Sequence, residues 1–164
     1  MPNEIPITRI FLVRHGETAL SIENRFAGSM DVPLSEAGRA QVARLAERLK
    51  NEAVAAVYSS PQTRTMETAE ILARPHGLAV VPCDGLREIS HGHWESMTLP
   101  EVREKFPEET AAWEEDPYTF APAGGESGLA VTARALPAFL EIVKRHPGKN
   151  VIVVSHKATI PLLL

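Results

Sequence analysis

Two histidines each follow an apolar segment that has the pattern of a buried β-strand. His15 comes directly after Arg14 and before Gly16, at the end of the run 9–13, while His156 follows the run 151–154. Ligands of open α/β sheets bind at the carboxyl ends of the strands. A histidine there, beside a permanent cation and a glycine that permits close approach, points to phosphate chemistry.

Phosphoryl transfer without a metal needs an unprotonated nucleophile, cations for the phosphate oxygens and an acid for the leaving alcohol. His15 is the candidate nucleophile, because neighbouring arginines lower a histidine pKa and favour the neutral imidazole. Arg14 and Arg64 are the candidate clamps, and Arg64 falls early in an expected helix, whose N-terminus adds positive potential. Glu88 is the candidate acid, and His156 is expected to contact the phosphate from the other side.

Composition narrows the class of protein. The 164 residues carry 44% apolar side chains, which suits a single domain over 1–164 with a real core. The net charge of −4, without a basic cluster, argues against nucleic acid as a partner. The single cysteine, Cys83, excludes a disulfide framework and is expected to be a small buried apolar residue. Residues 1–8 are short and polar, so we expect a cytoplasmic protein without membrane partners.

Strands and helices alternate along the chain. The segment 14–33 is expected to be a loop, Ser35 has the position of a helix N-cap, and Pro61 is expected in the first turn of the next helix. Thr98 and Glu101 have the spacing of a capping box. Strands are expected over 9–13, 53–58, 78–81 and 151–154, and helices over 35–49, 59–75, 98–106, 108–115 and 129–145, the last kinked at Pro137. This order predicts a mostly parallel sheet with helices on both faces.

Other residues with chemical potential have plainer interpretations. His91 and His93 form a pair of the kind that binds metals, but no further cysteine, histidine or acidic cluster has ligand spacing. Both are interpreted as loop residues, with His91 lining the pocket, and no metal or cofactor is expected. Trp94 and Trp113 are interpreted as packing residues rather than a stacking platform.

Seven short motifs, taken together, resemble the histidine phosphatase superfamily, also called the phosphoglycerate mutase-like family. The resemblance covers almost the whole chain from position 7 to position 164. Its motifs are LVRHGET at 12–18, NRFAG at 24–28, PLSEAG at 33–38, YSSP at 58–61 with Arg64 and TA at 68–69, LREI at 86–89 with GHWE at 92–95, GGES at 124–127 and VVSH at 153–156.

The resemblance implies an α/β three-layer sandwich and a two-step reaction without metal or organic cofactor. His15 would take the phosphoryl group to form a phosphohistidine. Glu88 would protonate the leaving oxygen and then act as a base towards water. Arg14, Arg64 and His156 would hold the phosphate.

Several positions depart from the family pattern. Ser21 stands where many members have a phosphate-binding asparagine, and Ala27 stands where a polar group often reaches the site. Lys157 replaces a common glycine and Pro161 a frequent arginine. Losing two polar contacts would weaken phosphate binding by about 1–3 kcal/mol each, and Lys157 would offset part of this if its ammonium turns inward. Ser21, Asn24 and Lys157 are therefore further candidate phosphate-binding residues.

The segment of about 96–125 is a flap insertion and bears on the choice within the family. Cofactor-dependent mutases have a longer, more basic insertion here, whereas this one carries seven acidic residues against Arg103 and Lys105. An acidic flap disfavours strongly anionic bisphosphates. We therefore expect a phosphomonoester phosphatase acting on a small phosphorylated metabolite. The alternatives are a cofactor-dependent phosphoglycerate mutase, suggested by the ENRF motif at 23–26, and a non-catalytic phosphate-binding module.

The chain stops at three leucines, 162–164, where family members continue with a helix and at least one more strand. We expect the C-terminal helix and strand of the fold to be missing. An uncovered sheet edge with apolar surface would then favour self-association, and a homodimer is a possible outcome.

Overall fold

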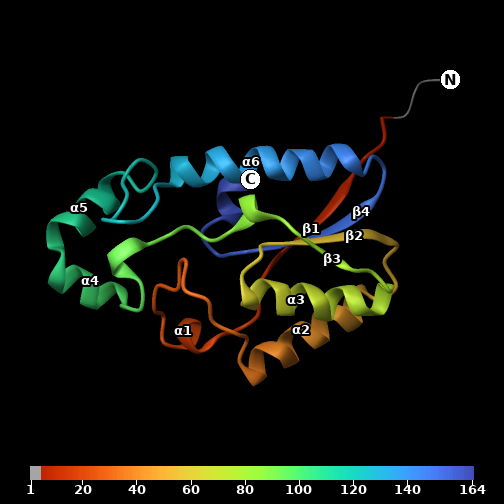
Figure 1. The fold of residues 1–164 in the computed structure, drawn as a ribbon, viewed down its shortest axis with the longest axis horizontal. Helices are drawn as coiled ribbons and strands as arrows, with labels where there is room; N and C mark the ends of the chain where they lie inside the picture. The colour runs from red at the N-terminus through yellow and green to blue at the C-terminus, as the bar shows by residue number, and fades with distance from the viewer. Residues whose placement is uncertain (1–4) are drawn as a thin grey trace.

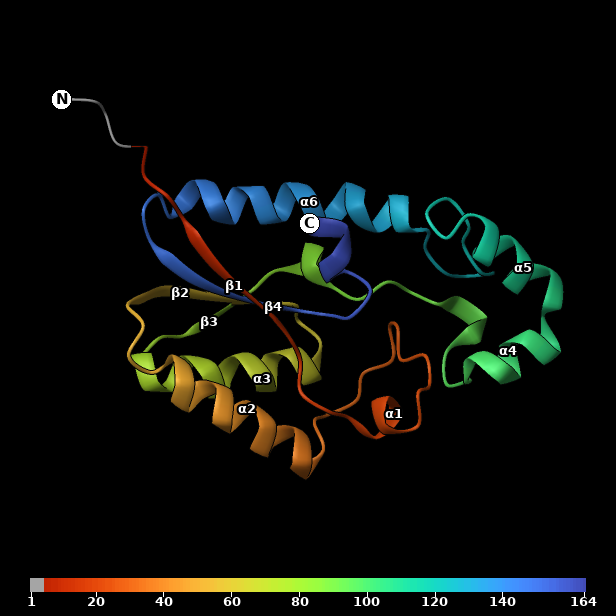
Figure 2. The same cartoon turned by 180° about the vertical axis from the view of Figure 1, so that it is seen from behind.

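The computed structural model describes residues 5–164; residues 1–4 of the polar N-terminal segment lie outside that range. Within it, four strands form one sheet in the order β1-β4-β2-β3, and every neighbouring pair is parallel. The strands are β1 (Arg9–Arg14), β2 (Val54–Ser59), β3 (Val80–Pro82) and β4 (Asn150–Ser155). Helices α2 (Glu36–Leu49) and α3 (Thr63–Ala73) cover one face, and α6 (Gly128–Arg145) covers the other, as Figures 1 and 2 show.

The central strand β4 contributes to both halves of the core. Val151 and Val153 pack in the cluster beneath α6, whereas Ile152 and Val154 pack in the cluster beneath α2 and α3. All four side chains are fully buried. A strand covered on both faces is apolar at every position, which is why its sequence is a continuous apolar run. The predicted three-layer α/β arrangement is confirmed.

The flap lies at one end of the molecule (Figure 1). It contains α4 (Leu99–Lys105) and α5 (Pro107–Glu115). Thr98 accepts a hydrogen bond from the Glu101 backbone, and the Glu101 carboxylate accepts one from the Thr98 N–H, so the predicted capping box is present. A bridge between Arg25 and Thr98 ties the flap to the segment that follows β1.

Helix α6 runs uninterrupted through Pro137 and starts at Ser127, whose hydroxyl accepts a hydrogen bond from the Ala130 N–H. A kink at Pro137 stays a prediction. Among the helices within 5–164, none is both long enough and apolar enough to cross a lipid bilayer.

Two local expectations were wrong. The segment expected to be a loop contains a one-turn helix, α1 (Ala19–Ile22), because Thr18 and Ser21 form a reciprocal capping box with serine in place of the usual acidic residue. Strand β3 is shifted towards the C-terminus, since Val80 and Pro82 are the residues that align with the carboxyl half of β2. Gly77, in the left-handed region at φ 65°, ends the helical turn Arg74–His76 that precedes the strand.

The start of α3 also differs from the expectation, because Pro61 lies before the helix rather than in its first turn. The Ser60 N–H still donates to the Val154 carbonyl (3.0 Å), so the chain follows the sheet beyond the end of β2. The helix then begins at Thr63, whose N–H and hydroxyl both donate to the Asp31 carboxylate (2.8 Å each). A residue from a distant loop thus caps α3, and it ties that loop to the helix.

The turn after β1 is held by a close approach to the first turn of α2. Gly16 and Gly38 face each other there, and a Cβ on Gly38 would lie 2.2 Å from the Glu17 carbonyl oxygen. Ser35 fixes the same turn, since its N–H donates to that carbonyl (2.8 Å) and its hydroxyl donates to the Glu17 carboxylate (2.8 Å). The packing of α2 therefore sets the position of the residues just after β1.

We expect Gly38→Ala to destabilise the protein by about 1–3 kcal/mol, because the new methyl group meets backbone that cannot move aside. Helix propensity alone predicts the opposite sign, a gain of about 1 kcal/mol. Urea unfolding measures the difference. Ala40→Gly, at an exposed position of the same helix, calibrates the propensity effect. A more stable Gly38→Ala variant would contradict the close-packing explanation.

Candidate active site

The pairing of β1 with β4 brings the two strand-end histidines together. Arg14 aligns with Ser155 in the parallel register, and the His15 N–H donates to the Ser155 carbonyl (3.2 Å). The rings of His15 and His156 therefore meet edge to face, with centroids 5.3 Å apart. The two histidines, far apart in the sequence, are thus neighbours in the structure.

The His15 ring is held in one orientation and one tautomer. Its Nδ1 lies 2.7 Å from the Gly16 carbonyl oxygen. Because a carbonyl can only accept, Nδ1 carries the hydrogen of the neutral ring and Nε2 keeps its lone pair. The pKa of His15 is lowered to about 4, chiefly by burial and also by the charges of Arg64 and Arg14, against the opposing hydrogen bond to Gly16. At neutral pH His15 is an uncharged imidazole with a free nitrogen.

Arg64 lies in the first turn of α3 and is fully buried. Its Nη1 donates to the Met30 carbonyl (2.7 Å) and its Nη2 to the Gly28 carbonyl (2.9 Å), so the loop capped onto α3 through Asp31 also holds the guanidinium. Burial lowers the pKa of Arg64 from its ordinary value, but an arginine keeps its charge. The buried Nε has no hydrogen-bond partner within residues 5–164.

Four other predicted phosphate-binding residues line the same cavity, whose volume is about 350 Å³: Arg14, Ser21, Asn24 and Lys157. Arg14 and Lys157 are exposed, and neither forms an ion pair within the described chain. Asn24 adopts a left-handed conformation with φ 54°. The Ser21 hydroxyl donates to the Thr18 carbonyl and accepts from its N–H, so its hydrogen is already used in capping α1.

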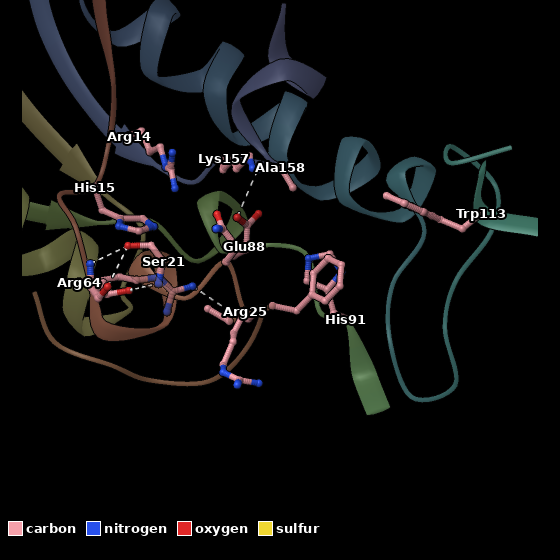
Figure 3. Close-up of a pocket in the computed structure, with 15 residues that line it drawn as sticks. Arg14, His15, Ser21, Arg25, Arg64, Glu88, His91, Trp113, Lys157 and Ala158 are labelled. Carbon is pink, nitrogen blue, oxygen red and sulfur yellow. Dashed lines mark hydrogen bonds between the residues drawn. The ribbon is translucent and has the colours of Figure 1, made fainter. Parts of the chain in front are cut away.

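Glu88 lies across the cavity from His15 (Figure 3). Its carboxyl group accepts hydrogen bonds from the N–H groups of Ile89 (2.9 Å) and Ala158 (3.2 Å). Burial raises the pKa of Glu88, and these donors and the charge of Arg64 only partly oppose the effect. A carboxyl group with a raised pKa can hold a proton closer to neutral pH and deliver it to a leaving group.

The Thr159 hydroxyl is matched to both protonation states of Glu88. Its oxygen lies 3.0 Å from Glu88 Oε1 and 2.9 Å from the Arg87 carbonyl oxygen, yet it has one hydrogen to donate. When Glu88 is ionised, the hydroxyl can donate to the carboxylate. When Glu88 is protonated, the Thr159 hydroxyl can accept a hydrogen bond from the carboxylic acid and donate its own hydrogen to the Arg87 carbonyl.

His156 is fully buried and is not among the residues that line the cavity, although its ring packs edge to face against that of His15. Its Nε2 is 2.8 Å from the Ser60 hydroxyl, while the buried Nδ1 has no partner within residues 5–164. The pKa of His156 is lowered to about 2, chiefly by burial and in smaller part by Arg64 and His15. The ring is therefore neutral.

Two positioning residues were missed by the sequence analysis. Gln62 accepts a hydrogen bond from the Glu88 N–H (3.0 Å) and donates to the Gly28 carbonyl (2.9 Å), the same oxygen that holds Arg64. Arg134, on α6, pairs with Glu126 through two nitrogens and donates to the Glu88 carbonyl (3.0 Å). Glu126 belongs to the GGES motif and could have been recognised from the sequence. No motif or local spacing indicates that Gln62 or Arg134 contributes to the site.

The other wall of the cavity is aromatic. Phe26, His91 and Trp113 line it, and Arg25 lies beside them. His91 thus lines the pocket as expected. Trp94 is a buried packing residue, whereas the expectation for Trp113 was incomplete, because it packs edge-on against Trp94 and also faces the cavity.

His93 and His91 do not form a shared metal-binding site in the described structure. Its Nε2 lies 2.7 Å from the Glu109 carboxylate, which also accepts a hydrogen bond from the Trp94 indole (2.8 Å). Over the described residues, no group of three or more histidine, cysteine, aspartate or glutamate side chains has an arrangement that could hold a metal ion.

The sequence model of the histidine phosphatase superfamily (branch 1) matches residues 10–164. This range contains the strand-end histidines, the buried arginine and the glutamate that the fold gathers around one cavity. The chain belongs to the histidine phosphatase superfamily.

Individual relatives are similar over nearly the whole chain. Phosphoserine phosphatase 1 of Hydrogenobacter thermophilus is 39% identical over 156 residues, which is 95% of this chain and 73% of that protein. The structure of Bacillus stearothermophilus YhfR superposes with a TM-score of 0.88 at 38% identity, covering 96% of this chain and 78% of that one. The structure of a mycobacterial glucosyl-3-phosphoglycerate phosphatase complexed with VO3 superposes with a TM-score of 0.85 at 34% identity. The match covers 93% of this chain and 76% of that one. Some relatives are much longer: the chain spans 43% of a bifunctional protein of Mycobacterium tuberculosis that is 39% identical.

We expect His15 to stay neutral, with its hydrogen on Nδ1, from neutral pH down to about pH 4. Long-range proton–nitrogen NMR correlations report both the tautomer and the titration midpoint, and His15→Gln assigns the signal. An unfolded histidine titrates near pH 6.5. Between these values the unfolded chain binds more protons, so the contribution of neutral His15 to stability is complete above about pH 6.5 and is lost as the pH falls towards 4. A hydrogen on Nε2, or a midpoint above pH 6, would contradict the described site.

Proposed function

We propose that this protein is a phosphomonoester phosphatase that acts through a phosphohistidine on His15. The observation that carries the proposal is that an Nδ1-protonated, neutral His15 faces a buried Glu88 across one cavity that Arg14 and Arg64 also line. The substrate is a small phosphorylated compound, since the cavity of about 350 Å³ suits a metabolite.

In the first step, the Nε2 lone pair of His15 attacks phosphorus and forms an N–P bond, while the bond from phosphorus to the ester oxygen breaks. Glu88 delivers its proton to that oxygen, and the alcohol leaves. Arg14 and Arg64 balance the charge of the phosphate oxygens, the role that a metal ion fills in other phosphatases. When Ser60 donates to His156 Nε2, the hydrogen of His156 lies on Nδ1, a buried nitrogen without another partner within residues 5–164. A contact between His156 and the phosphate stays a prediction.

In the second step, water attacks the phosphohistidine. The Glu88 carboxylate takes the proton of the attacking water, the N–P bond breaks, and its electron pair returns to His15 Nε2. Inorganic phosphate leaves, and Glu88 is protonated again for the next substrate. The Thr159 hydroxyl, which can bond either state of Glu88, suits this alternation.

Hydrolysis is favoured over the mutase alternative by both the relatives and the site. The similar proteins include enzymes named as phosphatases. In the cavity, the Arg25 guanidinium donates to the Ser96 carbonyl and to the carboxylates of Glu23 and Glu101, so its charge is balanced within the protein. Arg25 therefore offers little free positive charge to the second phosphate of a bisphosphate.

We expect His15→Ala to lower the hydrolysis of p-nitrophenyl phosphate by about 10³-fold or more, because the nucleophile is lost. Wild-type protein quenched in alkali during turnover should carry a phosphoryl group on His15, detected by mass spectrometry. His146→Gln, which alters a histidine bonded to Tyr58 away from the cavity, is the matched control. Ligand binding without any phosphohistidine would instead support a non-catalytic phosphate-binding module.

We expect Glu88→Gln to slow alkyl phosphate hydrolysis by about 10²–10⁴-fold, since an alkoxide leaves poorly without a proton. With p-nitrophenyl phosphate, whose leaving group needs little protonation, the variant should release one product per enzyme in a rapid burst and then stall as phosphohistidine. Stopped-flow absorbance separates the two phases. Glu115→Gln, at an exposed position of α5, controls for the loss of one charge. Equal losses on both substrates without a burst would exclude the acid–base role.

A further inference from the structure

The cavity has a second wall whose side chains take no part in phosphoryl transfer. Phe26 follows α1, His91 follows the Glu88 segment, and Trp113 lies on α5, so the fold gathers three aromatic rings from distant parts of the chain. The rings of Phe26 and His91 have centroids 4.6 Å apart. Figure 3 shows His91 and Trp113 on the side of the cavity away from Arg14 and His15.

This aromatic wall, formed by Phe26, His91 and Trp113, is held in place by hydrogen bonds and by packing. The Phe26 N–H donates to the Met97 carbonyl (2.9 Å), and the Phe26 carbonyl accepts from the Ser96 N–H (2.8 Å). Trp94 supports the wall from behind, with its ring centroid 5.8 Å from that of Phe26 and 5.9 Å from that of Trp113. A wall that is already in place loses little freedom when a ligand packs on it.

The aromatic wall is also electrically neutral. Burial lowers the pKa of His91 to about 4, so its ring is uncharged at neutral pH. The neighbouring cation, Arg25, is held by Glu23 and Glu101, with 2.9 Å between Arg25 Nη1 and the Glu101 carboxylate. A ligand carboxylate that packed on these rings would lose water there, and Arg25 would offer it little free positive charge.

Resting on the phosphatase function proposed above, we propose that the aromatic wall binds the leaving group, and that the preferred substrates are monophosphates of alcohols bearing an uncharged aromatic ring. With the phosphoryl group between Arg14 and His15, the alcohol extends past Glu88 towards Phe26, His91 and Trp113. An aromatic ring gains both apolar burial and ring-to-ring contact at that wall. A small charged alcohol such as serine gains neither.

Two esters with leaving alcohols of similar acidity test this preference without changing the chemistry. We expect kcat/KM for 2-phenylethyl phosphate to exceed that for propyl phosphate by about tenfold or more, and O-phosphoserine to be a poorer substrate than either. Phenylethylphosphonate and propylphosphonate, as inhibitors of p-nitrophenyl phosphate hydrolysis, measure the same preference in binding alone.

Variants of the aromatic wall locate the preference. Trp113→Ala should reduce the phenylethyl-to-propyl ratio to about threefold or less, in both turnover and inhibition, whereas Trp113→Phe should keep most of it. Tyr118→Leu, an exposed aromatic residue of the flap outside the cavity lining, is the matched control and should keep the wild-type ratio. Phe26→Leu gives an independent test from another element, should the change at Trp113 unfold the flap.

The possible failures are distinguishable. Wild-type protein that hydrolyses neither these esters nor p-nitrophenyl phosphate overturns the phosphatase function and this inference with it. Hydrolysis of p-nitrophenyl phosphate but of neither alkyl ester overturns the role of the aromatic wall alone. Hydrolysis of both esters with a ratio near one, or faster turnover of O-phosphoserine, leaves the phosphatase function standing and overturns the role of the aromatic wall. A preference that survives both Trp113→Ala and Phe26→Leu also overturns that role.

Discussion

The parallel pairing of β1 with β4 is the constraint on which the site depends. Its register, Arg14 against Ser155, sets both strand-end histidines at the same edge of the sheet and next to each other. A slip of one residue would turn every side chain of β1 to the opposite face and separate the rings. The apolar side chains of β4, which fill the core on both faces, oppose such a slip. Packing in the core therefore maintains the strand register that places the two histidines next to each other.

Burial has opposite effects on the two groups proposed to move protons and electrons. It disfavours the charged form of either group, so it lowers the pKa of His15 and raises that of Glu88. The first effect keeps a nucleophile unprotonated, and the second helps an acid to keep its proton. One physical cause, removal from water, thus prepares both partners for the same step, and the hydrogen bonds to Gly16 and Thr159 orient them.

Several features could be predicted from local sequence because their physical cause is local. The apolar runs of β1 and β4, the Ser35 cap of α2 and the Thr98–Glu101 box of α4 each depend on neighbours within a few positions. The start of α3 was misjudged for the opposite reason. Its cap comes from Asp31, and its preceding residues still pair with β4, so both causes lie far away in the sequence.

The sequence by itself determined which residue types make up the site, because short motifs carry them. They are histidines at two strand ends, an arginine early in a helix and a glutamate in a later loop. The tertiary structure decided how these groups are held and what surrounds them. Gln62 links the Glu88 segment to the loop that holds Arg64, and three aromatic rings line one cavity, only because segments distant in sequence converge. Such contacts produce no recognisable pattern in the local sequence, because each depends on how the whole chain packs.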